Sequence, residues 1–109
     1  MEKPVNPLID SFLNMLVAER GATVNTVSAY LNDISHFKKY LTENEIDSKI
    51  ESCSKDNISN YIKYLSKNGL NPRTATRRLS SLRQFFLFLQ SENHRSDNPT
   101  NNVDGPRQI

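Results

Sequence analysis

The chain has 109 residues, 36% of them hydrophobic and 24% charged, with a formal net charge of +2. This length and composition predict one soluble, mostly helical domain with a modest core. The sequence has no apolar run near the roughly 18 residues of a membrane span and no signal-peptide region. Its single cysteine excludes a disulfide framework. We therefore expect a cytoplasmic protein without membrane contact.

The charge is spread unevenly along the chain. Residues 1–54 hold five Lys/Arg and eight Asp/Glu, whereas residues 55–109 hold nine and four. Between Asn57 and Ser91 there are six cations and no acid. This asymmetry predicts an anionic partner for one face, and a merely solvated helix face is the alternative.

The first predicted helix begins at Asn6 and Pro7, because Asn is a good N-cap and Pro suits the first helical position. It ends near Arg20, with Gly21 as a left-handed cap. Its apolar stripe, expected to be buried, consists of Leu8, Ile9, Phe12, Leu13, Leu16 and Val17.

A second helix is predicted from about Thr23, its cap, to Leu41. Its expected buried face is Val24, Val27, Tyr30, Leu31, Ile34, Phe37 and Leu41. Small or polar side chains near its start allow close approach to another surface and can bind phosphates, although exposure to solvent alone also explains them: Asn25, Thr26, Ser28, Ala29 and Asn32.

Residues 42–53 show no periodicity and are predicted to form a loop whose two isoleucines lie on the core. A third helix runs from about Lys55 to Lys67, with Ser54 as its cap and Asn68-Gly69 at its end. Its apolar stripe is Ile58, Tyr61, Ile62 and Leu65. No segment alternates with a period of two, so we predict no sheet.

A fourth helix begins at Asn71-Pro72 and ends near Ser91. Its stripe is Ala75, Leu79, Leu82, Phe86 and Leu89. The opposite side presents Arg73, Arg77 and Gln84, flanked on one shoulder by Thr74, Arg78 and Ser81. Because Arg77 and Arg78 lie off the stripe, we expect that both can be replaced by alanine without unfolding the domain.

The last turns of this helix, Phe85 to Leu89, are apolar almost all round and need cover on several sides. The tail, a missing domain or a neighbouring subunit are the candidates for that cover. The tail is polar and rich in turn residues, so we place the domain at residues 1–95 and interpret residues 96–109 as a polar tail or linker.

No catalytic, metal or cofactor site is predicted. His36 and His94 stand apart from other ligand residues, and the sequence has no glycine-rich phosphate loop and no nucleophile elbow. Four helices with a basic, hydroxyl-rich face instead favour DNA binding. A helix fits the major groove, and the second and fourth helices can reach one duplex if they cross.

Two runs carry a resemblance to a known family. TVNTVSAYLNDISHFKKYL resembles the second helix of the N-terminal, SAM-like core-binding domain of tyrosine recombinases (phage integrases), especially the Xer type. NPRTATRRLSSLRQFFLFLQSENHRSDNPTNNVDGPR resembles the fourth helix and the exit of that domain. The resemblance covers residues 6–107 and implies an all-α, compact bundle of four to five helices that forms half of a C-shaped clamp on double-stranded DNA.

In the family, the second and fourth helices face the major groove near the crossover region. The resemblance implies that the DNA contacts of this chain are Thr26, Ser28, Ala29, Asn32, Arg73, Thr74, Arg77 and Ser81, with Arg78 at the shoulder. It also implies that the first helix and a tail helix contact other recombinase subunits in a synaptic tetramer. We expect the isolated domain to be a monomer.

The family's chemistry needs a tyrosine nucleophile and an Arg/His/Lys set in a C-terminal domain, and nothing in this sequence matches that set. The sequence ends two residues after Gly105-Pro106-Arg107, where such a domain would begin. We therefore interpret it as a non-catalytic DNA-binding module of a larger site-specific recombinase or integrase. The alternatives are a helical module that binds an acidic protein and, third, a helix-turn-helix regulator.

Overall fold

A computed structural model describes residues 6–46 and 49–106. In these ranges the chain forms α1 (Pro7–Arg20), α2 (Val24–Glu43), a short 3₁₀ turn η1 (Ile50–Ser52), α3 (Lys55–Lys67) and α4 (Pro72–Ser91). They contain no strand and no fifth α-helix, so the all-α prediction is confirmed with four helices. None of these helices has the length and apolar character needed to cross a membrane.

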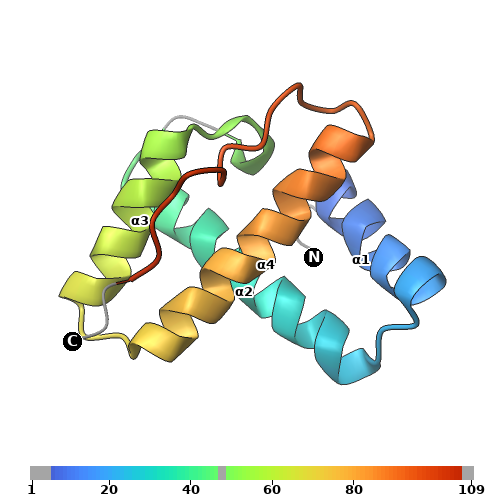
Figure 1. Ribbon diagram of the computed structural model, residues 1–109, viewed down its shortest axis with the longest axis horizontal. Helices are drawn as coiled ribbons and strands as arrows, with labels where there is room; N and C mark the ends of the chain where they lie inside the picture. The colour runs from blue at the N-terminus through green and yellow to red at the C-terminus, as the bar shows by residue number, and fades with distance from the viewer. Residues whose placement is uncertain (1–5, 47–48, 107–109) are drawn as a thin grey trace, which may run out of the picture.

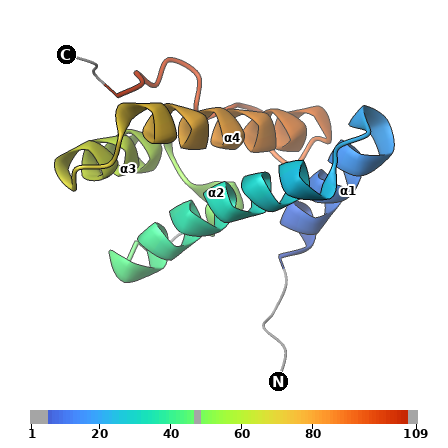
Figure 2. The ribbon, with the colours of Figure 1, turned by 90° about the horizontal axis from the view of Figure 1, so that it is seen from below.

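The two longest helices, α2 and α4, cross at the centre of the molecule (Figure 1). The perpendicular view shows α4 stacked over α2, with α1 and α3 at opposite ends of this pair (Figure 2). Each helix therefore buries one face against this central crossing.

Each helix begins at the cap that the sequence predicts. The side-chain oxygen of Asn6 accepts hydrogen bonds from the N–H groups of Leu8 and Ile9, and Asn71 accepts from the N–H of Arg73. Thr23 caps α2, and Ser54 forms a reciprocal capping box with Asn57 at the start of α3. These bonds satisfy N–H groups that have no partner within the helix.

The predicted stripes of α3 and α4 are buried completely, and the two loop isoleucines lie on the core, Ile46 partly and Ile50 fully buried. The stripes of α1 and α2 are wrong at three positions: Val17 is 52% exposed, Val24 82% and Leu31 41%. The fully buried residues of α2 begin only at Asp33, because its first turns project past the crossing with α4 (Figure 1).

The apolar end of α4 is covered within this chain. The ring of Phe12 in α1 lies 5.6 Å from that of Phe85 and 5.7 Å from that of Phe88, and Phe86 and Leu89 are fully buried. Leu87 alone of the five residues 85–89 is exposed. Part of this cover therefore comes from α1, which was not among the predicted candidates, and part from Arg95, whose guanidinium lies over the ring of Phe86.

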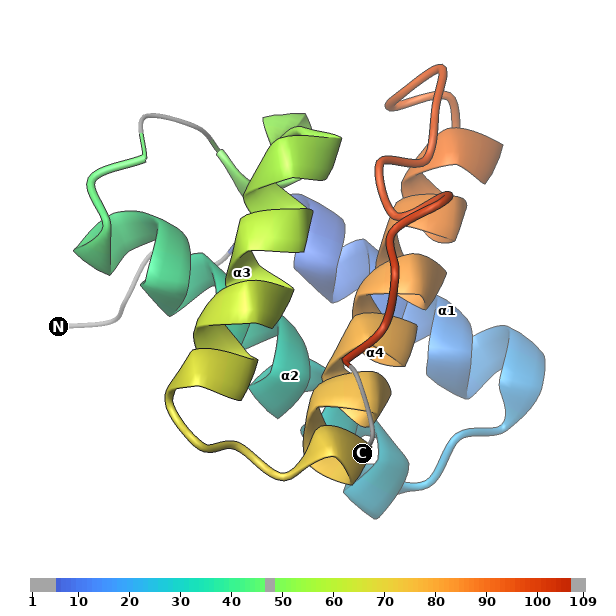
Figure 3. The same ribbon diagram turned by 60° about the vertical axis from the view of Figure 1, so that its left-hand side comes forward.

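The tail runs back from the end of α4 across the space between α3 and α4 (Figure 3). Pro99, Thr100 and Val103 are buried, and Arg83 donates a hydrogen bond to the carbonyl oxygen of Val103. Pro99, Thr100 and Val103 are therefore packed against the rest of the chain, whereas Asn101 and Asn102 between them are exposed. The boundary after residue 95 stays a prediction.

Arg95 fastens the start of the tail to the rest of the molecule. Its guanidinium lies 5.4 Å from the ring centroid of Phe86 and donates to the carbonyl oxygens of Glu51 and Cys53. Burial raises the pKa of the Cys53 thiol to about 12, and the nearby Arg95 only partly opposes this shift. The lone cysteine is thus a core residue with little thiolate at neutral pH.

Two leucines of α4 provide a matched test of this packing. Leu79 is 1% exposed and Leu87 is 45% exposed. We expect Leu79→Ala to lower the free energy of unfolding by about 2–5 kcal/mol, because it leaves a cavity in the core. Leu87→Ala should change it by no more than about 0.5 kcal/mol. Urea unfolding followed by circular dichroism measures both, and equal effects would contradict the described packing.

Candidate nucleic-acid interface

A buried carboxylate joins α2 to α4 where they cross. Asp33 is 2% exposed and accepts hydrogen bonds from two nitrogens of Arg77, at 2.6 Å from Nη2 and 3.2 Å from Nε. The Ser81 hydroxyl donates to the same carboxylate at 2.7 Å. Three charge-assisted hydrogen bonds therefore hold one acid of α2 to two residues of α4.

This cluster corrects the sequence-based interpretation of Ser81. We predicted Ser81 on the outward shoulder of α4, but it is 5% exposed and bonded to Asp33. The shoulder is covered because α2 crosses over it. Asp33 was missed altogether, although its position between Tyr30 and Phe37 on the apolar stripe signalled a buried acid in need of a partner.

A second polar cluster joins His36 of α2 to Tyr61 of α3, near the partly exposed Arg78. The hydroxyl of Tyr61 lies 2.7 Å from Nδ1 of His36, and burial raises the pKa of Tyr61 to about 12 against the opposing effect of Arg78. Burial, followed by the charges of Arg78 and Lys39, lowers the pKa of His36. The charge of Arg78 thus acts on His36 of α2 and Tyr61 of α3, and its buried Nε has no hydrogen-bond partner among the described residues.

The faces that meet at Asp33 continue toward the starts of both helices. On α2 the row through Asp33 runs back to Ala29 and Thr26, and on α4 the row through Ser81 and Arg77 runs back to Thr74 and Arg73. Both helix starts lie at the same edge of the molecule, the lower edge in Figure 1. The structure therefore brings these residues to one side, and all are exposed apart from Thr74, which is half-buried, and the buried Asp33 and Ser81.

The remaining predicted residues of α2 lie off this row. Asn32 and Ser28 are exposed, but at 3.6 residues per turn they are rotated from Asp33 by about 100° and about 140°. Ser28 therefore lies farthest round α2 from the row that Asp33 begins.

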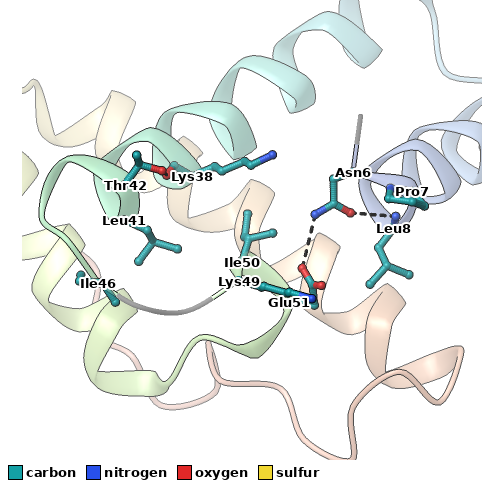
Figure 4. A pocket seen from close by; sticks show the side chains of 10 residues that line it. All are labelled: Asn6, Pro7, Leu8, Lys38, Leu41, Thr42, Ile46, Lys49, Ile50 and Glu51. Carbon is teal, nitrogen blue, oxygen red and sulfur yellow. Dashed lines mark hydrogen bonds between the residues drawn. The ribbon is translucent and has the colours of Figure 1, made fainter. Parts of the chain in front are cut away.

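A hollow beside the N-terminal helix lies at the other end of α2. It has a volume of about 460 Å³ and is lined by the start of α1, the end of α2 and η1 (Figure 4). Within it the Asn6 amide donates to Glu51 Oε1, while Lys38 and Thr42 belong to the end of α2 remote from Thr26. No group of three or more His, Cys, Asp or Glu in residues 6–46 and 49–106 is placed to hold a metal ion.

A family model described as phage integrase, N-terminal SAM-like domain matches residues 9–93. The chain belongs to this family. The resemblance carried by the two quoted runs is thereby confirmed, and so is the SAM-like fold class.

The relatives of this SAM-like domain are tyrosine recombinases. XerD of Agrobacterium fabrum is 38% identical over 100 residues, which are 92% of this chain and 30% of the relative. XerD of Listeria innocua is 31% identical over 104 residues, which are 95% of this chain and 35% of the relative. XerC of Herpetosiphon aurantiacus is 31% identical over 99 residues, which are 91% of this chain and 32% of the relative. The chain thus spans about a third of the length of these relatives. No solved structure matches it.

The Asp33 cluster changes what is expected of Arg77. Replacing Arg77 by alanine leaves a buried carboxylate without its ion partner, whereas the sequence reading expected the replacement to leave the fold intact. We expect Arg77→Ala to lower the free energy of unfolding by about 2–3 kcal/mol, below the cost of breaking a fully buried pair, because the guanidinium is half-exposed.

Arg73→Ala is the matched control, since Arg73 is exposed one turn earlier on the same helix. Its effect on the free energy of unfolding should stay within about 0.5 kcal/mol. The double variant Asp33→Asn/Arg77→Ala should lower the free energy of unfolding by less than the sum of the two single changes, because the two residues interact directly. An Arg77→Ala protein as stable as the wild type would show that the Asp33 contact contributes nothing.

Proposed function

We propose that this chain is the DNA-binding N-terminal part of a site-specific tyrosine recombinase, and that it holds duplex DNA with the starts of α2 and α4. The supporting observation is the crossing of these helices, which brings the starts of α2 and α4 to one edge of the molecule (Figure 1). Thr26, Ala29, Arg73 and Arg77 belong to the first halves of these helices and are exposed. Family membership points to the same role, since the relatives are named recombinases.

The proposed contacts follow from the chemistry at this edge. Arg73 lies in the first turn of α4. At this end of a helix the backbone N–H groups favour an anion, as does the guanidinium, so Arg73 is suited to bind a phosphate. The Thr26 hydroxyl accepts from Thr23 and keeps its own proton for donation. Ala29 is small enough for close approach to the groove and offers an apolar contact for a thymine methyl.

Other parts of the predicted set have different roles in this proposal. Ser81 supports the interface from within and does not touch DNA. Arg78 contributes mainly its charge, because its side chain is only partly exposed. Asn32 lies at the margin of the surface, and Ser28 contacts DNA only if the groove wraps around α2.

Strand cleavage and rejoining are assigned to the rest of the recombinase rather than to these residues. The chain spans about a third of its relatives, and Asp33, His36 and Tyr61 are engaged in hydrogen bonds with neighbouring side chains. In the whole protein α1 would contact neighbouring subunits, for which the exposed Val17 provides an apolar point of contact. We expect the isolated chain to be a monomer.

Salt dependence tests the proposal. We expect the chain to bind a mixed-sequence duplex of 20 base pairs at low salt, with log affinity falling by about 0.9 per unit of log salt concentration for each phosphate neutralised. Arg73→Ala should lower affinity for all sequences and reduce that slope by about one phosphate contact. Fluorescence anisotropy across a salt series measures both quantities.

Lys38→Ala is the control, because it removes the same charge from the far end of α2, beside the hollow in Figure 4. It should leave the slope nearly unchanged, apart from a small effect of net charge. No binding to duplex DNA at low salt would overturn the proposed function and favour an acidic protein as the partner of the basic face.

A further inference from the structure

We infer that Arg77 reads a base edge, with guanine as the best match, and that Asp33 and Ser81 are the positioning residues that aim it. This inference rests on the proposed function and deepens it by separating the two exposed arginines of α4. Arg73 then supplies affinity through a phosphate, and Arg77 supplies sequence preference.

The first step is the geometry of the guanidinium. It carries five N–H donors in one plane. Asp33 uses the donor side formed by Nε and Nη2, at 3.2 Å and 2.6 Å. This leaves Nη1 and the outer hydrogen of Nη2, which form the end of the fork, and the Arg77 side chain is 56% exposed. The end of the fork is therefore the part available to a ligand.

The second step is that this fork is held still. The Asp33 carboxylate is buried and is itself fixed by the Ser81 hydroxyl at 2.7 Å. A long arginine side chain normally loses rotamer freedom when it binds, but here most of that loss accompanies folding. Such preorganisation favours a directional contact over a diffuse one.

The third step is charge. The carboxylate lies 2.6 Å from the guanidinium and offsets most of its positive charge at a distance, so Arg77 attracts phosphate weakly. Its remaining N–H donors keep their direction. Guanine presents the acceptors O6 and N7 side by side in the major groove, which matches the two donors at the end of the fork. Arg73 has no side-chain hydrogen bond among the described residues and keeps its full charge for phosphate.

The experiment first selects preferred duplexes from a randomised pool of 20 base pairs at low salt, using the whole 109-residue chain. Each guanine of the selected duplex is then replaced in turn by 7-deazaguanine, which lacks the N7 acceptor but still pairs with cytosine. For the wild type we expect one guanine whose replacement lowers affinity by about fivefold or more. The Arg77→Lys variant keeps a cation beside Asp33. For this variant, replacing the same guanine by 7-deazaguanine should have little effect on affinity.

Two variants separate positioning from structural support. Asp33→Asn removes the compensating charge, so we expect weaker discrimination at the sensitive guanine together with a salt slope that is steeper by about one phosphate. Ser81→Ala is the milder change and should reduce discrimination without altering the slope. Thermal melts establish that each variant is folded, and a loss of fold alone would weaken binding to every duplex without steepening the slope.

The outcomes distinguish the two proposals. Absence of binding to every duplex would overturn the proposed function and this inference together. The inference alone would be overturned if affinity falls with salt as proposed but no guanine of the selected duplex is sensitive to the loss of N7. A folded Arg77→Lys or Asp33→Asn protein with unchanged sequence preference would also overturn the inference alone.

Discussion

The Asp33 carboxylate is the constraint on which the arrangement of α2 and α4 depends. A carboxylate that is almost fully buried is costly unless several donors meet it, and here all the donors come from one helix, at Arg77 and Ser81. These two residues are four apart on α4, so they face α2 together. Sliding or rotating α4 by one residue would remove both donors, and the carboxylate thus specifies the register of the crossing.

That register also determines which surface remains free. The contact at Asp33 uses the middle of each helix, and the turns before it run out to the same edge of the molecule (Figure 1). The exposed Thr26 and Ala29 are the continuation of the Asp33 row, and Arg73 is the continuation of the Arg77 row. One buried contact and two helical periodicities therefore account for the composition of the candidate interface.

Much of the fold could be predicted from the sequence because local signals agreed with one another. The caps at Asn6, Thr23, Ser54 and Asn71 and the prolines that follow two of them placed every helix start. Periodicity alone failed at Val24 and Leu31, because it identifies an apolar face without saying how far the covering helix extends. It also could not assign Phe12 of α1 to the end of α4, since that contact joins residues more than 70 positions apart.

The candidate site was predicted less well, for a related reason. A helical projection separates core from surface but does not show where a second helix crosses the boundary between them. Ser81 and Arg77 lie on that boundary, and α2 buries the first while leaving the second half-exposed. Arg77 consequently donates to Asp33 with one side of its guanidinium and leaves the other side exposed. In the proposed complex with DNA, the stability of the crossing and the selectivity of the surface would therefore depend on the same side chain, and a substitution there would alter both at once.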